Sequence, residues 1–241
     1  MEKFKALLVV VSTLAFAAGP FLVPGFGGFD PTLYPIPQID PPVQPAGYAF
    51  AIWGVIYVWL VVHAGFGYFK RRHAEDWEPM RWPLIASLAV GAIWLPVAMV
   101  SPVWAVILIF FMLVTALMAM NRAPFLDQWF AEEPVALYAG WLTAASFAGL
   151  GILGAGYGVV FGQIGWAWIA LAGALITAFI GHNLRPEAVA YPLGTAWALI
   201  AIMVQNWGSQ WLLVFGAFVG AVILLLLAAR AFQRQQRLEV R

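Results

Sequence analysis

Long apolar runs separated by short polar connections extend over almost the whole chain. Eight such runs lie near residues 5–24, 47–69, 82–101, 103–121, 134–156, 165–182, 190–206 and 210–232. Their lengths suit α-helices that cross a bilayer, which need about 17 to 25 mainly apolar residues. The pattern therefore predicts an all-α fold, a polytopic transmembrane helical bundle of about eight helices.

The composition agrees with a membrane protein and narrows its chemistry. Hydrophobic residues make up 63% of the chain and charged residues 10%, whereas about a quarter of the residues in a soluble domain are charged. No connection between the runs is long enough to form a separate soluble domain. The sequence contains no cysteine, which excludes disulfides and thiolate-bound metals.

The distribution of basic residues predicts the topology. All twelve Lys and Arg residues fall at one end of the expected bundle, because the connections after the first, third, fifth and seventh runs contain none. Since translocated segments avoid Lys and Arg, both termini are expected in the cytoplasm of a bacterium, with the chain in its inner membrane. The first run resembles a cleavable signal peptide, with Ala15-Phe16-Ala17 as the cleavage site, but we interpret it as a retained signal-anchor helix.

A Pro-rich loop, residues 24–46, separates the first two runs on the expected extracytoplasmic side. It contains seven prolines and the carboxylates Asp30 and Asp40. Proline fixes φ and removes a backbone donor, so the loop should be stiff and either extended or turned. Such a loop can cover the mouth of a helix bundle or serve as a plain connection, and the sequence leaves both alternatives open.

The stretch over residues 41–69, where this loop enters the second run, carries a distinctive aromatic pattern. Phe50, Trp53 and Tyr57 follow one another at spacings of three and four residues, which places their rings on one face of a helix. His63 lies later in the same run. We expect that no carboxylate lies inside any run and that His63 is the only ionisable residue there. A binding site is therefore expected first on this helix.

This stretch resembles the second helix of the TspO/MBR family, the tryptophan-rich sensory proteins, in which a Pro-rich loop leads into F-x-x-W-x-x-x-Y. The segment LYAGWLTAASF at residues 137–147 is similar to the LY-x-x-W-L-x-x-A pattern of that family's fifth helix. The resemblance implies a TspO-like five-helix core over residues 1–156. Residues 157–241 would then add three helices and a basic tail within one structural domain, making the chain a divergent, extended member of the family.

Two departures concern the pocket in which family members hold their ligands. An Asn usually lies near the tryptophan of helix three and another near the middle of helix five, but here these segments are GAIWLP (residues 91–96) and FAGL (residues 147–150). The resemblance implies ligands such as porphyrins and other tetrapyrroles in bacteria and sterols in eukaryotes. In this chain they would be bound without the two amides.

The candidate ligand-binding residues are aromatic side chains of the second, third and fifth runs: Phe50, Trp53, Tyr57, Trp94, Tyr138 and Trp141. Eight of the thirteen tryptophans lie near the ends of runs, as in an interfacial aromatic belt, but Trp53, Trp94 and Trp141 lie within runs. These indoles either contact a flat apolar ligand or pack with their N–H groups bonded to backbone carbonyls. His63 is either an axial ligand to the metal of a tetrapyrrole or a structural imidazole.

The sequence offers no pattern typical of catalysis, so we assign no catalytic or metal-binding residue and do not expect an enzyme. The favoured function is binding of a hydrophobic, tetrapyrrole-like molecule within the lipid bilayer, in a sensory, carrier or regulatory role. Nucleic acid is not an expected partner. The alternatives are an accessory structural subunit of a larger photosynthetic or respiratory membrane complex and a facilitative transporter, and the motif Gly216-x-x-x-Gly220 suits either internal packing or a homodimer.

Overall fold

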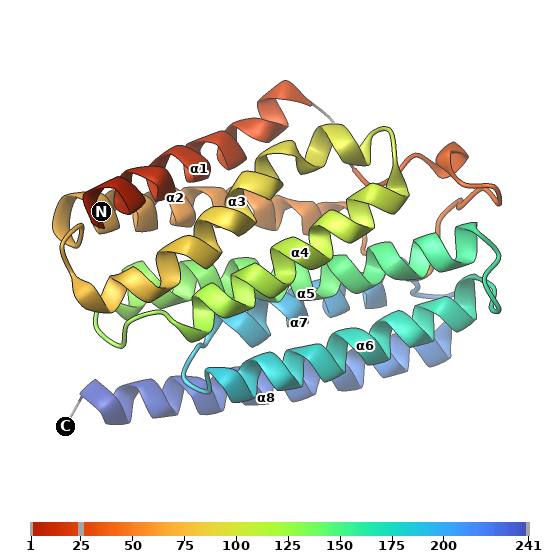
Figure 1. Cartoon of the computed structure of the whole chain (residues 1–241). Helices are drawn as coiled ribbons and strands as arrows, with labels where there is room; N and C mark the ends of the chain where they lie inside the picture. Colours follow the sequence, from red (N-terminus) through yellow and green to blue (C-terminus); the bar gives the residue numbers. More distant parts are fainter. Residues whose placement is uncertain (1, 24–26, 240–241) are drawn as a thin grey trace.

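A computed structural model describes residues 2–23 and 27–239, and this part of the chain is all-helical, without strands (Figure 1). Its α-helices are α1 (Glu2–Leu22), α2 (Ile52–Lys70), α3 (Glu78–Ala98), α4 (Pro102–Asn121), α5 (Gln128–Gly156), α6 (Gln163–Leu184), α7 (Ala190–Gln205) and α8 (Trp211–Glu239). Seven are long and apolar enough to cross a membrane, and α7, with 16 residues, is shorter. The predicted polytopic helical bundle is thus confirmed.

Local sequence explains the sharp break between α3 and α4. The Ser101 hydroxyl accepts a hydrogen bond from the backbone N–H of Trp104 at 3.4 Å, and Pro102 is the first residue of α4. A serine N-cap followed by proline favours a helix start, because the cap satisfies a free N–H and proline has none to lose. Two antiparallel helices therefore form where an uninterrupted apolar stretch would give one.

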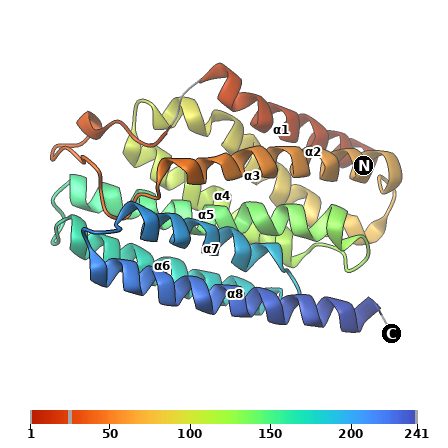
Figure 2. The same ribbon diagram turned by 180° about the vertical axis from the view of Figure 1, so that it is seen from behind.

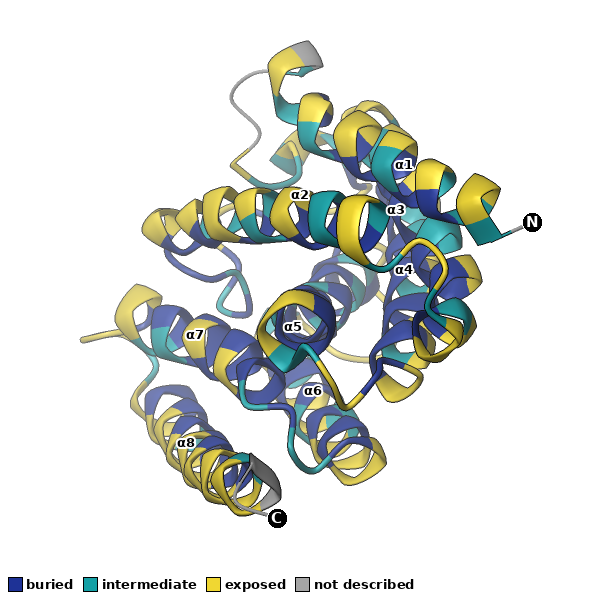
Figure 3. Ribbon diagram, turned by 90° about the vertical axis from the view of Figure 1, so that its left-hand side faces the viewer, coloured by how far each residue is buried: buried dark blue, intermediate teal, exposed yellow. Residues whose placement is uncertain are grey.

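The first five helices form a closed ring in the order α1, α2, α5, α4 and α3. Helices α6 and α7 pack on the other side of α5, and α8 covers α7 and α6. The end-on view shows α5 between the ring and this second group (Figure 3), and the opposite face shows α7 alongside α5 and α8 (Figure 2). Helix α5 is therefore the wall that both halves share.

Small residues allow α5 and α7 to approach at backbone distance. A Cβ atom added at Gly140 would lie 2.1 Å from the carbonyl oxygen of Tyr191, and one added at Gly194 would lie 2.8 Å from that of Leu137. The Thr195 hydroxyl donates to the carbonyl oxygen of Gly140 at 2.8 Å. Helices inside membranes associate through such close packing and interhelical hydrogen bonds, because lipid supplies little hydrophobic driving force.

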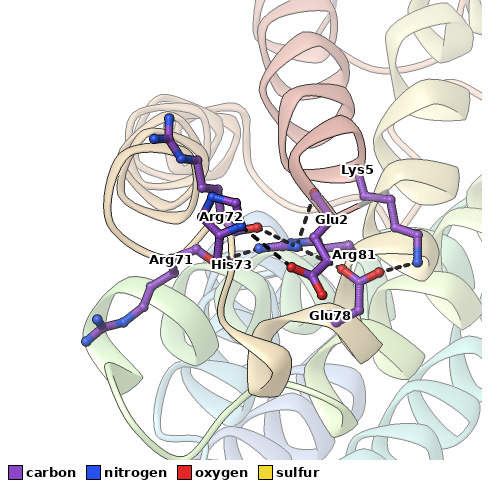
Figure 4. A network of polar contacts seen from close by, with 7 residues as sticks. All are labelled: Glu2, Lys5, Arg71, Arg72, His73, Glu78 and Arg81. Atoms are coloured by element: carbon purple, nitrogen blue, oxygen red, sulfur yellow. Dashed lines mark hydrogen bonds and ion pairs between the residues drawn. The ribbon is translucent and has the colours of Figure 1, made fainter.

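Charged residues join α1, α2 and α3 at the end of the bundle where both termini lie (Figures 1 and 4). Arg81, which is 2% exposed, donates to the Glu78 carboxylate at 2.8 Å and to the Arg71 carbonyl at 2.7 Å. The Lys5 ammonium binds the same carboxylate. Because Glu78 is shared by Lys5 of α1 and Arg81 of α3, and Arg81 also binds the chain directly after α2, this network fixes how the three helices meet.

The expectation that no carboxylate lies inside a membrane helix is wrong. Helix α5 begins at Gln128 rather than near residue 134, and it contains Glu132 and Glu133, both buried. Glu132 accepts hydrogen bonds from Arg185 at 2.8 and 3.1 Å. Glu133 accepts from the backbone N–H groups of residues 189 and 190, at the start of α7. Partners from distant parts of the chain thus compensate both charges. The hydropathy of the segment alone does not predict this compensation.

The Pro-rich loop crosses the end of the bundle opposite to the termini and is tied to the helices there. The backbone N–H of Ile36 donates to the Gly156 carbonyl at 2.9 Å, and that of Ala46 donates to the Ala201 carbonyl at 3.2 Å. The Asn206 amide donates to the Pro42 carbonyl at 2.8 Å. These bonds favour the covering role over the plain connection. Residues 24–26, with the first proline of the predicted loop, lie outside the described residues.

Candidate functional site

Helices α1 to α5 line a partly open cavity of about 360 Å³ in the half of the bundle beneath the Pro-rich loop. This volume falls within the range of about 300–1,000 Å³ that is usual for small-molecule sites. The walls consist of Phe16, Ala17, Pro20, Phe21, Val23, Phe50, Trp53, Gly54, Tyr57, Gly91, Trp94, Leu95, Ile109, Met112 and Leu142. No wall residue carries a charge, so the cavity suits an apolar ligand.

Aromatic rings from different helices meet in the wall of this cavity. Trp53 and Tyr57 of α2 stack with ring centroids 5.4 Å apart and planes 17° apart. The ring of Phe16, from α1, meets both edge-on, at 5.8 and 5.1 Å. Pairs of this kind hold one another's orientation, because the positive edge of one ring faces the negative face of another. The cavity therefore has flat, pre-oriented aromatic surfaces.

The aromatic residues singled out from the sequence lie together, but in different roles. Phe50, Trp53, Tyr57 and Trp94 line the cavity. Trp141 meets Phe50 and Trp53 edge-on, each at 6.0 Å, and lines a smaller hollow beside the cavity. The sixth candidate, Tyr138, is fully buried behind the wall, where its hydroxyl lies 3.0 Å from that of a serine in α3. Tyr138 therefore supports the wall and is not part of its surface.

The smaller hollow, about 70 Å³, lies directly beneath the Pro-rich loop. Loop residues Phe29, Gln44 and Pro45 form one side of it, and it shares Phe50 and Trp94 with the larger cavity. The Phe29 ring meets the Trp94 ring edge-on at 6.2 Å. The loop thus contacts the same aromatic wall that faces the cavity.

Another loop residue anchors this cover. Tyr34 is 4% exposed, and its ring packs edge-on against that of Phe29 at 6.4 Å. Burial raises the pKa of the Tyr34 phenol well above its ordinary value, because an apolar environment disfavours the phenolate. Tyr34 is therefore neutral at physiological pH and places no charge beneath the loop, whose two carboxylates, Asp30 and Asp40, are exposed.

Polar groups near the site are few. The Trp94 indole N–H donates to the Ala105 carbonyl at 2.8 Å, whereas the buried Trp141 indole N–H has no hydrogen-bond partner among the described residues. The Gln44 side chain lines the same small hollow as Trp141. Gly91 and Gly149 belong to the segments that lack the family's asparagines. Gly91 lines the larger cavity and Gly149 the smaller hollow, and neither contributes a polar side chain. A ligand would find its hydrogen-bond donors at Trp141 and Gln44.

His63 lies apart from this cavity, nearer the end of α2. It is 2% exposed, its Nδ1–H donates to the Phe130 carbonyl at 2.7 Å, and its ring stacks on that of Trp77 at 5.3 Å. The hollow beside it measures about 10 Å³, which is too small for a tetrapyrrole. These contacts favour the structural alternative for His63, and its role as an axial ligand stays a prediction that we do not carry into the proposed site.

Comparison with known families bears on the identity of this helix ring. The model of a family described as TSPO-like protein matches residues 36–230, most of the chain. The chain belongs to the TSPO-like protein family. The match starts inside the Pro-rich loop and continues through α6, α7 and most of α8, so this TSPO-like chain resembles the family beyond the first 156 residues. Searches among curated proteins and solved structures give no significant match.

Several wall residues of the TSPO-like chain escaped the sequence analysis. Phe16, Ile109, Met112 and Leu142 line the cavity, but each is one apolar residue within an apolar run, so hydropathy does not distinguish it. The only local signal was Gly91. A Cβ atom there would lie 2.7 Å from the Phe16 ring, so this glycine lets α1 and α3 approach closely.

Proposed function

We propose that this TSPO-like chain binds a flat hydrophobic molecule of the tetrapyrrole class in the ring cavity, in a non-catalytic sensory, carrier or regulatory role. The observation that carries the proposal is the uncharged cavity of about 360 Å³ with the aromatic residues Phe50, Trp53, Tyr57 and Trp94 in its wall. A planar π-system stacks favourably on such surfaces. Binding among aromatic side chains with a few polar groups at one end is typical of small-molecule sites.

The orientation of the ligand follows from the two ends of the site. The apolar body of the ligand would lie against the stacked pair of Trp53 and Tyr57, and a polar edge would point toward the Pro-rich loop. There the buried indole N–H of Trp141 has no partner among the described residues, and the Gln44 side chain lines the adjoining hollow. A hydrogen bond from the Trp141 indole N–H to an acceptor on the ligand would remove the cost of a buried unsatisfied donor.

The orientation in the membrane is part of the proposal. Both termini lie at the end of the bundle that carries the Lys5, Arg71 and Arg81 network (Figures 1 and 4). Because Lys and Arg are retained on the cytoplasmic side, we place this end on the cytoplasmic side of a bacterial inner membrane. The Pro-rich loop and the mouth of the ligand site then face the opposite side.

Titration of the purified protein with protoporphyrin IX tests the site. Binding is followed through the visible absorption of the porphyrin, so that removal of a tryptophan does not remove the signal. Replacing Trp53 with Leu should weaken binding on the order of tenfold, because a stacking surface is lost. Replacing Trp141 with Leu should weaken it as well, through loss of the free donor.

The matched control is Trp129→Leu, at the other end of α5, where the side chain is 67% exposed. This variant should bind the porphyrin like the parent protein. Equal affinity of the parent, Trp53→Leu and Trp141→Leu proteins would refute the proposed site. A comparable loss in the Trp129→Leu control would show that the porphyrin responds to the membrane surface of the protein instead.

A further inference from the structure

Another apolar hollow lies on the outside of the bundle, between α6 and α8, well away from the ring cavity. It measures about 320 Å³, and the residues that form it include Ile176, Phe179 and Ile180 from α6 and Ile223, Leu224 and Leu227 from α8. The two helices run side by side in both ribbon views (Figures 1 and 2). Four of these side chains are about half exposed, so the groove opens toward the lipid.

The groove face of α8 changes from apolar to cationic along the helix. Ile223, Leu227, Arg230 and Arg234 follow one another at spacings of four, three and four residues, which keeps them on one helix face. Arg230 and Arg234 are exposed. No ion pair joins either guanidinium to a carboxylate of the described residues. Two unpaired positive charges therefore lie directly beyond the apolar groove.

Helix α6 brings a third polar group to the same end. His182 follows Phe179 by three residues, is 6% exposed, and has an Nδ1 atom with no partner among the described residues. The charges that act on its ring are those of Arg234, Glu187 and Arg230. Glu187 is already paired with the Arg185 guanidinium at 3.3 Å. An anion at this position would thus meet two free cations and one free ring nitrogen.

We propose that the groove between α6 and α8 binds one anionic phospholipid, with an acyl chain against Phe179 and Leu227 and its phosphate at Arg230, Arg234 and His182. The groove and the cations at its end are complementary to the two parts of such a lipid. The apolar groove matches a hydrocarbon chain in shape and polarity, and guanidinium groups at its end match a phosphate through charge-assisted hydrogen bonds. Basic pockets between membrane helices bind acidic headgroups in this manner.

The main competing occupant is a second copy of the chain. In a membrane, two copies share one orientation, so a symmetric contact through this face would bring both copies of Arg230 and Arg234 to the same level. Like charges at short distance in a low-dielectric environment repel strongly. An acidic lipid removes this repulsion, whereas a second copy creates it, so the charges favour the lipid.

Native mass spectrometry of the detergent-solubilised protein tests the site. Dioleoyl-phosphatidylglycerol is added as the anionic probe and dioleoyl-phosphatidylcholine as the zwitterionic one. The protein should retain one phosphatidylglycerol in preference to phosphatidylcholine. In the double variant Arg230→Gln/Arg234→Gln, binding of phosphatidylglycerol should weaken about tenfold or more, with binding of phosphatidylcholine unchanged.

The matched control is Arg72→Gln/Arg122→Gln, which removes two exposed cations from the same end of the bundle but away from the groove. It should bind phosphatidylglycerol like the parent protein. Equal losses in the two double variants would overturn the proposal, because attraction would then follow overall charge. Unchanged binding in the Arg230→Gln/Arg234→Gln variant would overturn it directly.

A third variant tests the acyl-chain part of the site. Ile176→Trp narrows the groove at a side chain that is 62% exposed, so the fold should tolerate it. This variant should also retain less phosphatidylglycerol. Full displacement of the lipid by millimolar inorganic phosphate, or a lipid-independent dimer that Ile176→Trp disrupts, would refute the proposal in favour of an anion site or a contact between copies.

Discussion

Replacing Gly140 with Ala tests the central packing contact of the fold, between α5 and α7. The added Cβ would lie 2.1 Å from the Tyr191 carbonyl oxygen, whereas ordinary contact begins at 3.4 Å. The obstacle is backbone, which cannot rotate out of the way as a side chain can. Helix α7 must therefore move away from α5 by about 1 Å, and such overpacking costs about 1–3 kcal/mol.

Two smaller effects modify this magnitude. Moving α7 also strains the hydrogen bond from Thr195 to the Gly140 carbonyl, and interhelical bonds in membranes contribute about 0.6 kcal/mol on average. Alanine gains about 0.5–1 kcal/mol over glycine inside a helix. The two nearly cancel, so we expect Gly140→Ala to lower the free energy of unfolding by about 1–3 kcal/mol.

Thermal unfolding in detergent, followed by circular dichroism, measures this effect. For a chain of this size the midpoint should fall by roughly 2–12 °C. Gly65→Ala is the matched control, because a Cβ atom at that position meets nothing within 4 Å. It should unfold at the parent temperature or slightly above it. A Gly140→Ala protein as stable as the parent would refute the close α5–α7 contact, as would equal losses of stability in both variants.

Two further predictions concern the buried ion pair and the orientation of the bundle. Replacing Glu132 with Ala leaves Arg185 buried with Glu187 as its one carboxylate partner, and should lower the free energy of unfolding by about 3 kcal/mol. The double variant Glu132→Ala/Arg185→Met should regain much of this stability. A Glu132→Ala protein as stable as the parent would contradict the pairing. Because the sequence lacks cysteine, Ser209→Cys and His73→Cys each introduce a unique label site at opposite ends of the bundle. A membrane-impermeant maleimide should label intact cells at residue 209 only, and the reverse pattern would invert the proposed topology.

The positions of the helices could be predicted from the sequence because hydropathy is a local property of each segment. The predicted runs near 103–121 and 165–182 correspond to α4 (Pro102–Asn121) and α6 (Gln163–Leu184). An informative difference is at the start of α5, which begins at Gln128, because Glu132 and Glu133 interrupt the apolar pattern but not the helix. A hydropathy scale counts these carboxylates as polar. It does not include the ion pair with Arg185, and this pair is what allows Glu132 to be buried inside the protein.

The candidate site was predictable in part for the same reason. The spacing of Phe50, Trp53 and Tyr57 indicated a shared face, and all three side chains line the cavity. Phe16 and Met112 were not predictable, since nothing in an apolar run marks the residue that faces a cavity rather than a neighbouring helix. The displacement of Tyr138 into the supporting layer depends on its hydrogen bond across to α3, which no local pattern contains.

The sequence by itself determined that this chain is a membrane protein, that it forms eight helices, and that its basic residues gather at one end. Length, hydropathy and charge of each segment suffice for these properties, because each helix satisfies its own backbone hydrogen bonds in lipid. Only the tertiary structure decided that α1 to α5 close into a ring around a cavity, that α5 is shared with α7, and that α6 and α8 leave a groove ending at Arg230. These features depend on where small residues allow two backbones to approach and on which distant charges form pairs. Both are properties of two segments together, so the sequence of one segment does not determine them.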